Sequence, residues 1–248
     1  MPVFRIEIAG VPAEIRCRFP ENEDFFEDYR TEKEPLFSIE PQEEDLLRSQ
    51  ANFERVAERE GFSPYTPSKA YLENAAIHGL LAEKLTEYQV LLMHGSALCM
   101  DGQAYIFTAK SGTGKSTHAL LWREVYGDRV WMINDDKPML KVSGDGVTVY
   151  GTPWDGKHRL SRNASAPLKA IVKLERGEQN RIEPLRGADA YVTLFRQCFG
   201  SLKPEVGRRI AEMEKQILTT IPFYSLYCNM DPDAARVSYE GMNKGHIR

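Results

Sequence analysis

Residues 109–116 combine small, hydroxyl and basic side chains at a spacing suited to holding a chain of phosphates. The segment matches the phosphate-loop pattern G-x-x-x-x-G-K-[ST] at every fixed position except the first, which is Ala109. Gly112 and Gly114 permit the unusual dihedrals that turn successive amides inward, at the positive end of a following helix. Alanine at the first position adds a methyl group and removes no amide donor. The alternative is a glycine-rich turn that only joins a strand to a helix.

The side chains and the backbone of this segment have separate expected roles. Lys115 is expected to reach the β and γ phosphates of ATP, and the Ser116 hydroxyl is expected to ligate Mg²⁺. The remaining contacts with the nucleotide are expected from the loop and the first helical turn. The predicted nucleotide-binding residues are Ser111, Gly112, Thr113, Gly114, Lys115, Ser116 and Thr117.

Two acidic residues, Asp135 and Asp136, directly follow an apolar run at 130–134 that predicts a strand. A parallel strand would place both carboxylates at the carboxyl edge of a sheet, beside the glycine-rich segment. One carboxylate can then hold Mg²⁺, for which we expect Asp135, while its neighbour accepts a proton from an attacking hydroxyl. The residues alone do not decide which aspartate is the base. The alternative is an acidic turn at the end of a strand.

Three short blocks resemble the HPr kinase/phosphorylase superfamily, whose members are structurally akin to ATP-dependent phosphoenolpyruvate carboxykinase. The blocks are Met-His-Gly at 93–95, the glycine-rich segment at 111–116 and Asn-Asp-Asp at 134–136. The resemblance implies a kinase that transfers the γ-phosphoryl group of ATP to an acceptor hydroxyl. It also implies that His94 lies near the reacting phosphoryl group and that the two aspartates supply the metal site and the catalytic base.

The stretch at 152–160 resembles the divergent small kinases grouped as HPr kinase-like, and the overlapping segment 154–162 is basic. Lys157, Arg159 and Arg162 lie close to Gly156, and cations on such a loop can close on a triphosphate or on an anionic acceptor. We expect Arg159 to offset charge that develops on the transferred group. We expect Lys157 and Arg162 to contact the substrate. Solvated loop charges are the alternative.

The elements that must position these residues follow the order strand, loop and helix. Apolar runs predict two strands separated by a turn at 101–102, and a helical pattern follows the glycine-rich segment. The predicted fold is α/β, with a mixed central sheet, a phosphate loop and flanking helices, like the carboxykinase and the carboxyl-terminal domain of HPr kinase. The predicted strands lie at 90–93, 104–108, 130–134, 170–174 and 223–228, and helices are predicted at 188–199 and 205–220.

The first 89 residues predict a β-rich extension to this core. Alternating apolar side chains over 3–19 indicate a hairpin, and Thr66 with the following proline predicts the start of a helix that runs to about residue 88. No repeat or low-complexity linker separates the parts. We therefore predict one domain over 1–248, with the extension at 1–89 and the kinase core at 90–248.

Composition disfavours several classes of partner. The 248 residues carry a formal net charge of -4 without a long basic block, which argues against nucleic acid and anionic membranes. No segment reaches the roughly 20 consecutive apolar residues of a membrane span, and the opening residues show no secretory signal. The four cysteines lie far apart, which argues against a zinc site and predicts reduced thiols in the cytoplasm.

The sequence leaves the acceptor open between a serine on a protein and a hydroxyl of a small metabolite. Two rival functions also stay open, a carboxykinase acting on oxaloacetate and a sensor module that binds nucleotide without transferring phosphate. The chain is short for a carboxykinase. Guanine-specifying sequences are absent, which favours ATP over GTP. The resemblance allows a homo-oligomer, although the residues give no interface signal of their own.

Overall fold

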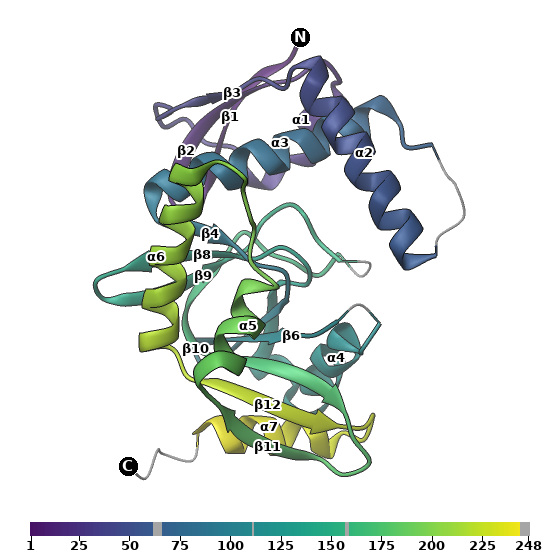
Figure 1. Cartoon of the computed structure of the whole chain (residues 1–248), viewed down its shortest axis with the longest axis vertical. Coiled ribbons are helices and arrows are strands. Elements are labelled where there is room, and N and C mark those ends of the chain that lie inside the picture. The colour runs from purple at the N-terminus through teal and green to yellow at the C-terminus, as the bar shows by residue number, and fades with distance from the viewer. Residues whose placement is uncertain (62–65, 111, 157–158, 244–248) are drawn as a thin grey trace. The chain divides into compact units, whose positions relative to one another are not determined.

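The chain divides into two units, Met1–Tyr88 and Gln89–Arg248. The computed structural model describes residues 1–61, 66–110, 112–156 and 159–243 (Figure 1). The grouping of both units into one domain stays a prediction.

The first unit is built on the predicted hairpin. β1 (Val3–Ile8) pairs antiparallel with β2 (Val11–Arg16), and β3 (Ser38–Ile39) joins β2 in parallel. Alternate side chains of β1 are buried, so the period of two in the sequence produces one apolar face. The helices of this unit are α1 (Glu21–Phe25), α2 (Glu43–Glu60) and α3 (Lys69–Leu85), with 3-10 turns at Glu27–Tyr29 and Thr86–Tyr88.

The start of α3 differs from the sequence prediction. The capping residue is Ser68 rather than Thr66, and its Oγ accepts a hydrogen bond from the Tyr71 amide at 3.1 Å. Serine and threonine both suit this position, so residue type alone does not select between them.

The second unit is built on a mixed sheet of nine strands in the described residues. Their order is β4-β8-β9-β10-β6-β5-β7, with β12 beside β10 and β11 beside β12. The long strand β10 joins the two parts of the sheet, because its first residues pair with β9 and its later residues pair with β6 and β12. The strands are β4 (Val90–Leu92), β5 (Ser96–Met100), β6 (Gln103–Thr108), β7 (Val130–Asn134), β8 (Met139–Ser143), β9 (Gly146–Tyr150), β10 (Ser165–Arg176), β11 (Arg181–Leu185) and β12 (Phe223–Cys228).

One edge of this sheet collects the carboxyl ends of four strands. β6, β10 and β12 run parallel to one another. β5 is antiparallel to both β6 and β7, so β7 points the same way as β6. The residues that follow β6 and β7 therefore lie at the same edge, as the sequence prediction for the glycine-rich segment and the two aspartates requires.

The strand β5 was not predicted, and it lies between β6 and β7. All five of its residues are buried, so they show no alternation that would separate a strand from a plain apolar run. The tight turn to β6 uses Asp101 and Gly102, both at positive φ. Gly95 lies just before β5 and close to β6. A Cβ atom at this position would lie 2.9 Å from the Ile106 Cγ2 and 3.1 Å from the Phe107 carbonyl oxygen, so the site leaves little room for a side chain.

Helices cover both faces of the sheet, and β6 shows how its side chains alternate between them. Ile106 belongs to the cluster packed by α5 (Gly187–Phe195) and α6 (Pro204–Thr220), whereas Tyr105 and Phe107 belong to the cluster packed by α4 (Lys115–Tyr126) and α7 (Asp233–Asn243). The mixed α/β fold class is therefore confirmed. None of the helices in the described residues is both long enough and apolar enough to cross a membrane.

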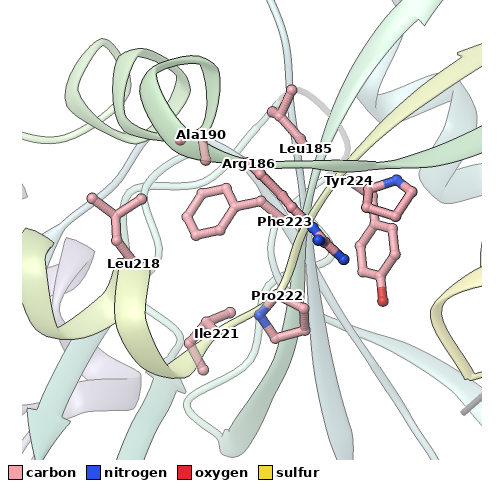
Figure 2. Close-up of a pocket in the computed structure, with 10 residues that line it drawn as sticks. Leu185, Arg186, Ala190, Leu218, Ile221, Pro222, Phe223 and Tyr224 are labelled. Carbon is pink, nitrogen blue, oxygen red and sulfur yellow. The ribbon is translucent and has the colours of Figure 1, made fainter. Parts of the chain in front are cut away.

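A pocket of about 300 Å³ opens where β12 begins (Figure 2). Its walls come from the ends of β11 and α6 and the first turn of α5, and they include Arg186, Leu218 and Phe223. Phe223 is the first residue of β12, so the pocket lies at the edge of the sheet opposite the carboxyl ends of the parallel strands. No described residue of the predicted site lines it.

Trp122 anchors α4 against the sheet and α7. Its ring is fully buried and lies 5.2 Å from the ring of Tyr105 and 5.3 Å from that of Phe107, measured between centroids. The indole N–H donates to the Ser238 Oγ at 2.9 Å and to the His118 Nε2 at 3.2 Å. These contacts fix the helix whose first turn carries Lys115.

The buried His118 should make the stability of this unit depend on pH. Burial lowers the pKa of His118 from 6.5 to about 3, so the folded unit keeps the ring neutral while the unfolded chain protonates it. Above the pKa of the unfolded chain, the ring is neutral in both states and the stability of the unit is complete. As the pH falls from that value toward the folded pKa, protonation of the unfolded chain lowers the free energy of unfolding. From pH 7 to pH 5 this loss is about 2 kcal/mol of unfolding free energy.

Denaturant unfolding followed by tryptophan fluorescence measures this loss, because all three tryptophans belong to the second unit. The His118→Phe variant removes the titrating group. Its unfolding free energy should fall by about 2 kcal/mol less than that of the parent between pH 7 and pH 5. Equal losses in both proteins would contradict the prediction.

Candidate active site

Residues 112–114 of the glycine-rich segment form a turn that leads into α4. Gly112 and Gly114 have φ angles of 73° and 117°, in the region that favours glycine. Gly114 caps α4 without a side chain, so no side-chain cap occupies the first amides of the helix. Within the turn, the Thr113 amide donates to the Lys110 carbonyl at 3.2 Å. Thr117 is exposed in the first turn of the helix, and Ser111 lies outside the described residues.

A basic residue that the sequence prediction missed holds this turn. The Arg176 guanidinium donates to the Gly112 carbonyl oxygen at 2.8 Å. Arg176 ends β10, which runs parallel to β6, so its side chain starts from the same edge of the sheet. The sequence prediction ended this strand at 174, two residues too early to draw attention to the arginine.

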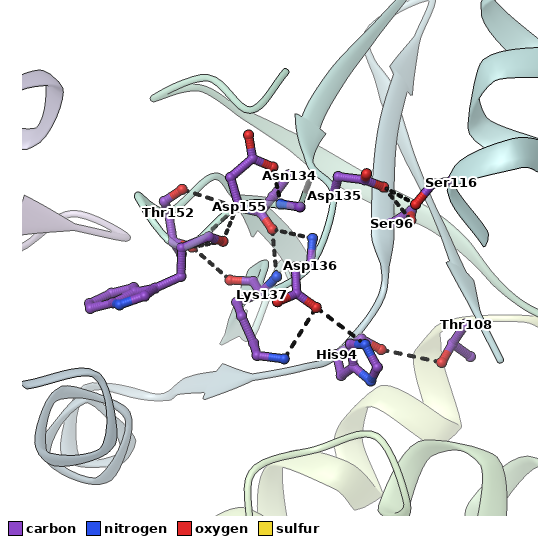
Figure 3. Close-up of polar contacts among 12 residues, drawn as sticks. His94, Ser96, Thr108, Ser116, Asn134, Asp135, Asp136, Lys137, Thr152 and Asp155 are labelled. Atoms are coloured by element: carbon purple, nitrogen blue, oxygen red, sulfur yellow. Dashed lines mark hydrogen bonds and ion pairs between the residues drawn. The ribbon is translucent and has the colours of Figure 1, made fainter. Parts of the chain in front are cut away.

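Asp135 is enclosed by hydroxyl groups and by glycine. Its side chain is buried, and its Oδ1 accepts hydrogen bonds from the Ser96 Oγ at 2.6 Å and the Ser116 Oγ at 3.5 Å (Figure 3). On the other side, a Cβ atom on Gly156 would lie 2.7 Å from the Asp135 Oδ2. The amide of Asp135 donates to the Ser161 Oγ at 3.2 Å. The structure thus brings Asp135 and Ser116 together, as predicted for a shared metal ion.

Asp136 lies in a basic environment and is half-buried. Its Oδ1 lies 3.2 Å from the His94 Nε2 and 3.2 Å from the Lys137 Nζ (Figure 3). Burial raises the pKa of Asp136, but the hydrogen bond with His94 and the charge of Lys137 outweigh burial and lower the pKa below its usual value. Asp136 is therefore a carboxylate at neutral pH. The two adjacent aspartates have different neighbours.

Lys115 lies within the field of both aspartates. Burial lowers the pKa of its ammonium group, the charges of Asp136 and Asp135 raise it, and the like charge of Lys137 lowers it again, with a net lowering. The described structure thus gathers two lysines, two aspartates and His94 at the carboxyl edge of the sheet. Such a site offers both signs of charge to a ligand.

Asn134 connects the end of β7 with the segment that follows β9. Its side chain is fully buried, and its Nδ2 donates to the carbonyl oxygens of Thr152 and Trp154 at 3.0 and 3.1 Å. Its Oδ1 accepts from the amides of Asp136 and Lys137 at 2.9 and 2.6 Å. The pairing of β5 with β7 also shifts register next to Asn134, and such a bulge re-aims the residues at a strand end.

The two described basic residues of the 154–162 stretch, Arg159 and Arg162, make different contacts. Arg159 is exposed at a positive φ of 46°, and its amide donates to the Gly156 carbonyl at 3.2 Å. The Arg162 guanidinium lies 5.6 Å from the centre of the Trp131 ring, and no described contact joins it to either aspartate. Lys157 lies outside the described residues.

The oxygen atoms of this site suit a magnesium ion that is held partly by a ligand and by water. The described residues contain no group of three or more histidine, cysteine, aspartate or glutamate side chains able to hold a metal ion. Magnesium prefers oxygen ligands and commonly binds one or two carboxylates together with phosphate oxygens and water. The Asp135 carboxylate beside the Ser116 hydroxyl provides that kind of donor set.

Comparisons with known proteins give little help with this site. No protein-family model and no curated protein matches the chain. A search of solved structures finds the Hpr(Ser) kinase/phosphatase from Coxiella burnetii, with 11% sequence identity over 60% of this chain and 95% of that chain, at a TM-score of 0.34. Similarity at this level is weak, and no role for a residue follows from it.

Removal of the Asn134 amide should destabilise the second unit. In Asn134→Ala, the carbonyl groups of Thr152 and Trp154 each lose one hydrogen bond, and the amides of Asp136 and Lys137 lose their side-chain acceptor. This should cost about 3 kcal/mol or more of unfolding free energy. Asn134→Asp keeps an acceptor for the two amides but faces the carbonyl groups with a negative charge, so it should be at least as damaging. Denaturant unfolding followed by tryptophan fluorescence measures both. A loss below 1 kcal/mol in Asn134→Ala would contradict this account.

Proposed function

We propose that this chain is a magnesium-dependent kinase that transfers the terminal phosphoryl group of ATP to an acceptor hydroxyl. The observation that supports the proposal most is the meeting of a glycine-rich turn, a lysine and two differently held aspartates at one edge of the sheet. The contact of Ser116 with Asp135 is central to it, because this contact joins the first turn of α4 to the residue that follows β7.

The turn and the start of α4 would hold the phosphates of ATP. The uncapped amides at the start of α4 and the positive end of the helix favour anions. Lys115 would contact the β and γ phosphates, as a cation that already lies in a desolvated position. Ser111, Gly112, Thr113, Gly114 and Thr117 are proposed as further nucleotide contacts.

Ser116 and Asp135 would hold Mg²⁺ together with phosphate oxygens. When bound, the ion neutralises charge on the β and γ phosphates. Asp135 suits this role because its Oδ1 already faces two hydroxyl groups and its burial keeps bulk water away.

Asp136 would receive the proton of the acceptor. It is more exposed than Asp135, and it is ionised at neutral pH. In the transfer, the acceptor oxygen bonds to the terminal phosphorus while the bond from phosphorus to the β–γ bridging oxygen breaks, and the hydroxyl proton passes to Asp136. His94 and Lys137 orient this carboxylate from two sides.

Basic residues would offset the charge on the transferred group. Lys115 is the best placed of them in the described structure. Arg159 is proposed for the same role because its loop passes beside Asp135, and Lys157 and Arg162 are proposed as weaker contacts with the acceptor. The acceptor itself is proposed as a hydroxyl of a protein serine or of a small metabolite, in the cytoplasm.

Two substitutions separate nucleotide binding from transfer. Lys115→Ala should weaken ATP binding at least about tenfold, whereas Asp136→Asn should keep ATP affinity within about threefold and reduce transfer about 100-fold or more. Binding is measured by calorimetry. Transfer is measured as radiolabel from the γ-phosphate in cell extract fractionated by size.

Matched controls are Lys169→Ala and Asp145→Asn, which remove the same groups at exposed positions in β10 and in the turn between β8 and β9. Both should behave as the parent.

Label in the protein fraction would identify a protein kinase, and label in the small-molecule fraction would identify a metabolite kinase. ATP binding without transfer to any fraction would make the chain a sensor module and would refute the proposal, as would unchanged ATP affinity in Lys115→Ala.

A further inference from the structure

The segment between β9 and β10 passes directly beside Asp135 and is tied to β7 at both ends. At its start, the carbonyl groups of Thr152 and Trp154 accept hydrogen bonds from the Asn134 side chain. At its end, the Arg162 amide donates to the Ile133 carbonyl at 3.1 Å. The described residues near these two points therefore lie close to the end of the strand that carries the two aspartates.

Asp155 closes this segment into a loop. Its Oδ1 accepts the Gly156 amide at 2.6 Å and the Ser161 hydroxyl, and its Oδ2 accepts the Ser161 amide at 2.9 Å. Three donors from both ends of the loop thus meet one carboxylate. A carboxylate that accepts several hydrogen bonds holds its partners more strongly than a neutral acceptor does.

The Ser161 hydroxyl carries this arrangement on to Asp135. A hydroxyl has one proton to donate and lone pairs to accept with. The proton of Ser161 points to Asp155, so its oxygen is left to accept the Asp135 amide, at 3.2 Å. The chain of contacts runs in one direction, from the Asp135 amide through Ser161 to the Asp155 carboxylate.

The same loop sets the space available to the Asp135 carboxylate. Because Gly156 follows Asp155 directly, the hydrogen bond from its amide to Asp155 fixes the backbone that faces the Asp135 Oδ2. Asp135 is thus bounded by Ser96 and Ser116 on one oxygen, by Gly156 on the other and by Ser161 at its amide.

We infer that Asp155 and Ser161 are positioning residues, which aim the Asp135 carboxylate at the Ser116 hydroxyl and thereby set the affinity of the proposed site for Mg²⁺. The inference rests on the proposed function for the identity of the ligand. Both residues are inferred to act through Asp135 and not through contact with the ligand. Outer groups that orient a metal ligand commonly change metal affinity by 10- to 100-fold when they are removed.

The test measures how ATP affinity depends on Mg²⁺ in the full chain. Calorimetry gives the ATP affinity without Mg²⁺ and at a series of Mg²⁺ concentrations. In Ser161→Ala, the Mg²⁺ concentration that gives half of the full gain in ATP affinity should rise about tenfold. ATP affinity without Mg²⁺ should stay within about twofold of the parent, because the predicted phosphate loop is untouched.

Ser161→Thr keeps the hydroxyl and should return the Mg²⁺ response to within about threefold of the parent. Asp155→Asn removes one charged acceptor and should shift the response in the same direction as Ser161→Ala, so it also serves if Ser161→Ala does not fold. Ser165→Ala removes an exposed serine at the start of β10 and should change nothing.

The results separate this inference from the proposed function. A parent that binds ATP with Mg²⁺ dependence but transfers no phosphate would refute the kinase and still test the positioning residues. A parental Mg²⁺ response in both Ser161→Ala and Asp155→Asn would overturn the inference. An equal loss of ATP affinity with and without Mg²⁺ would overturn it as well, because a general loss of structure has that signature. If the ATP affinity of the parent did not change with Mg²⁺, both the proposed function and this inference would be overturned.

Discussion

A single buried amide group governs the geometry of the candidate site. The side chain of Asn134 has donors on one atom and an acceptor on the other, so it serves the carbonyl groups of one segment and the amides of another at once. A carboxylate or an apolar side chain of similar size lacks one or both of these capacities. Because the turn after β7 and the segment after β9 both depend on this amide, the positions of the two aspartates and of the loop beside them are coupled.

That coupling explains how two identical neighbours in the sequence acquire different chemistry. Asp135 meets hydroxyl groups and a glycine backbone and is buried. Asp136 meets a histidine and a lysine and retains more contact with solvent. Hydroxyl neighbours suit a carboxylate that shares a hard cation, whereas a hydrogen bond from histidine and the charge of a lysine keep a carboxylate ionised and oriented. Environment, rather than residue type, separates the two proposed roles.

The sequence predicted the parts of this arrangement that depend on local chemistry. The order of strand, glycine-rich turn and helix follows from periodicity and glycine spacing, and the strand before Asp135 follows from its apolar run. The predicted mixed α/β class holds for the same reason. Ser96 was missed because β5 is buried along its whole length and carries no periodic signal. Asp155 and Ser161 were missed because they act through contacts made by an irregular loop, whose path no pattern in the sequence reveals.

The hydrogen bond from Arg176 to the Gly112 carbonyl bears on the proposed binding of phosphates at this turn. A flexible glycine-rich turn would have to lose conformational freedom when a polyphosphate arrives, and that loss would subtract from affinity. Here Arg176, at the end of β10, holds the carbonyl group of Gly112. The same hydrogen bond involves none of the amides of the turn. The restraint belongs to the folded sheet, so the turn would be preorganised for the phosphates of the proposed nucleotide.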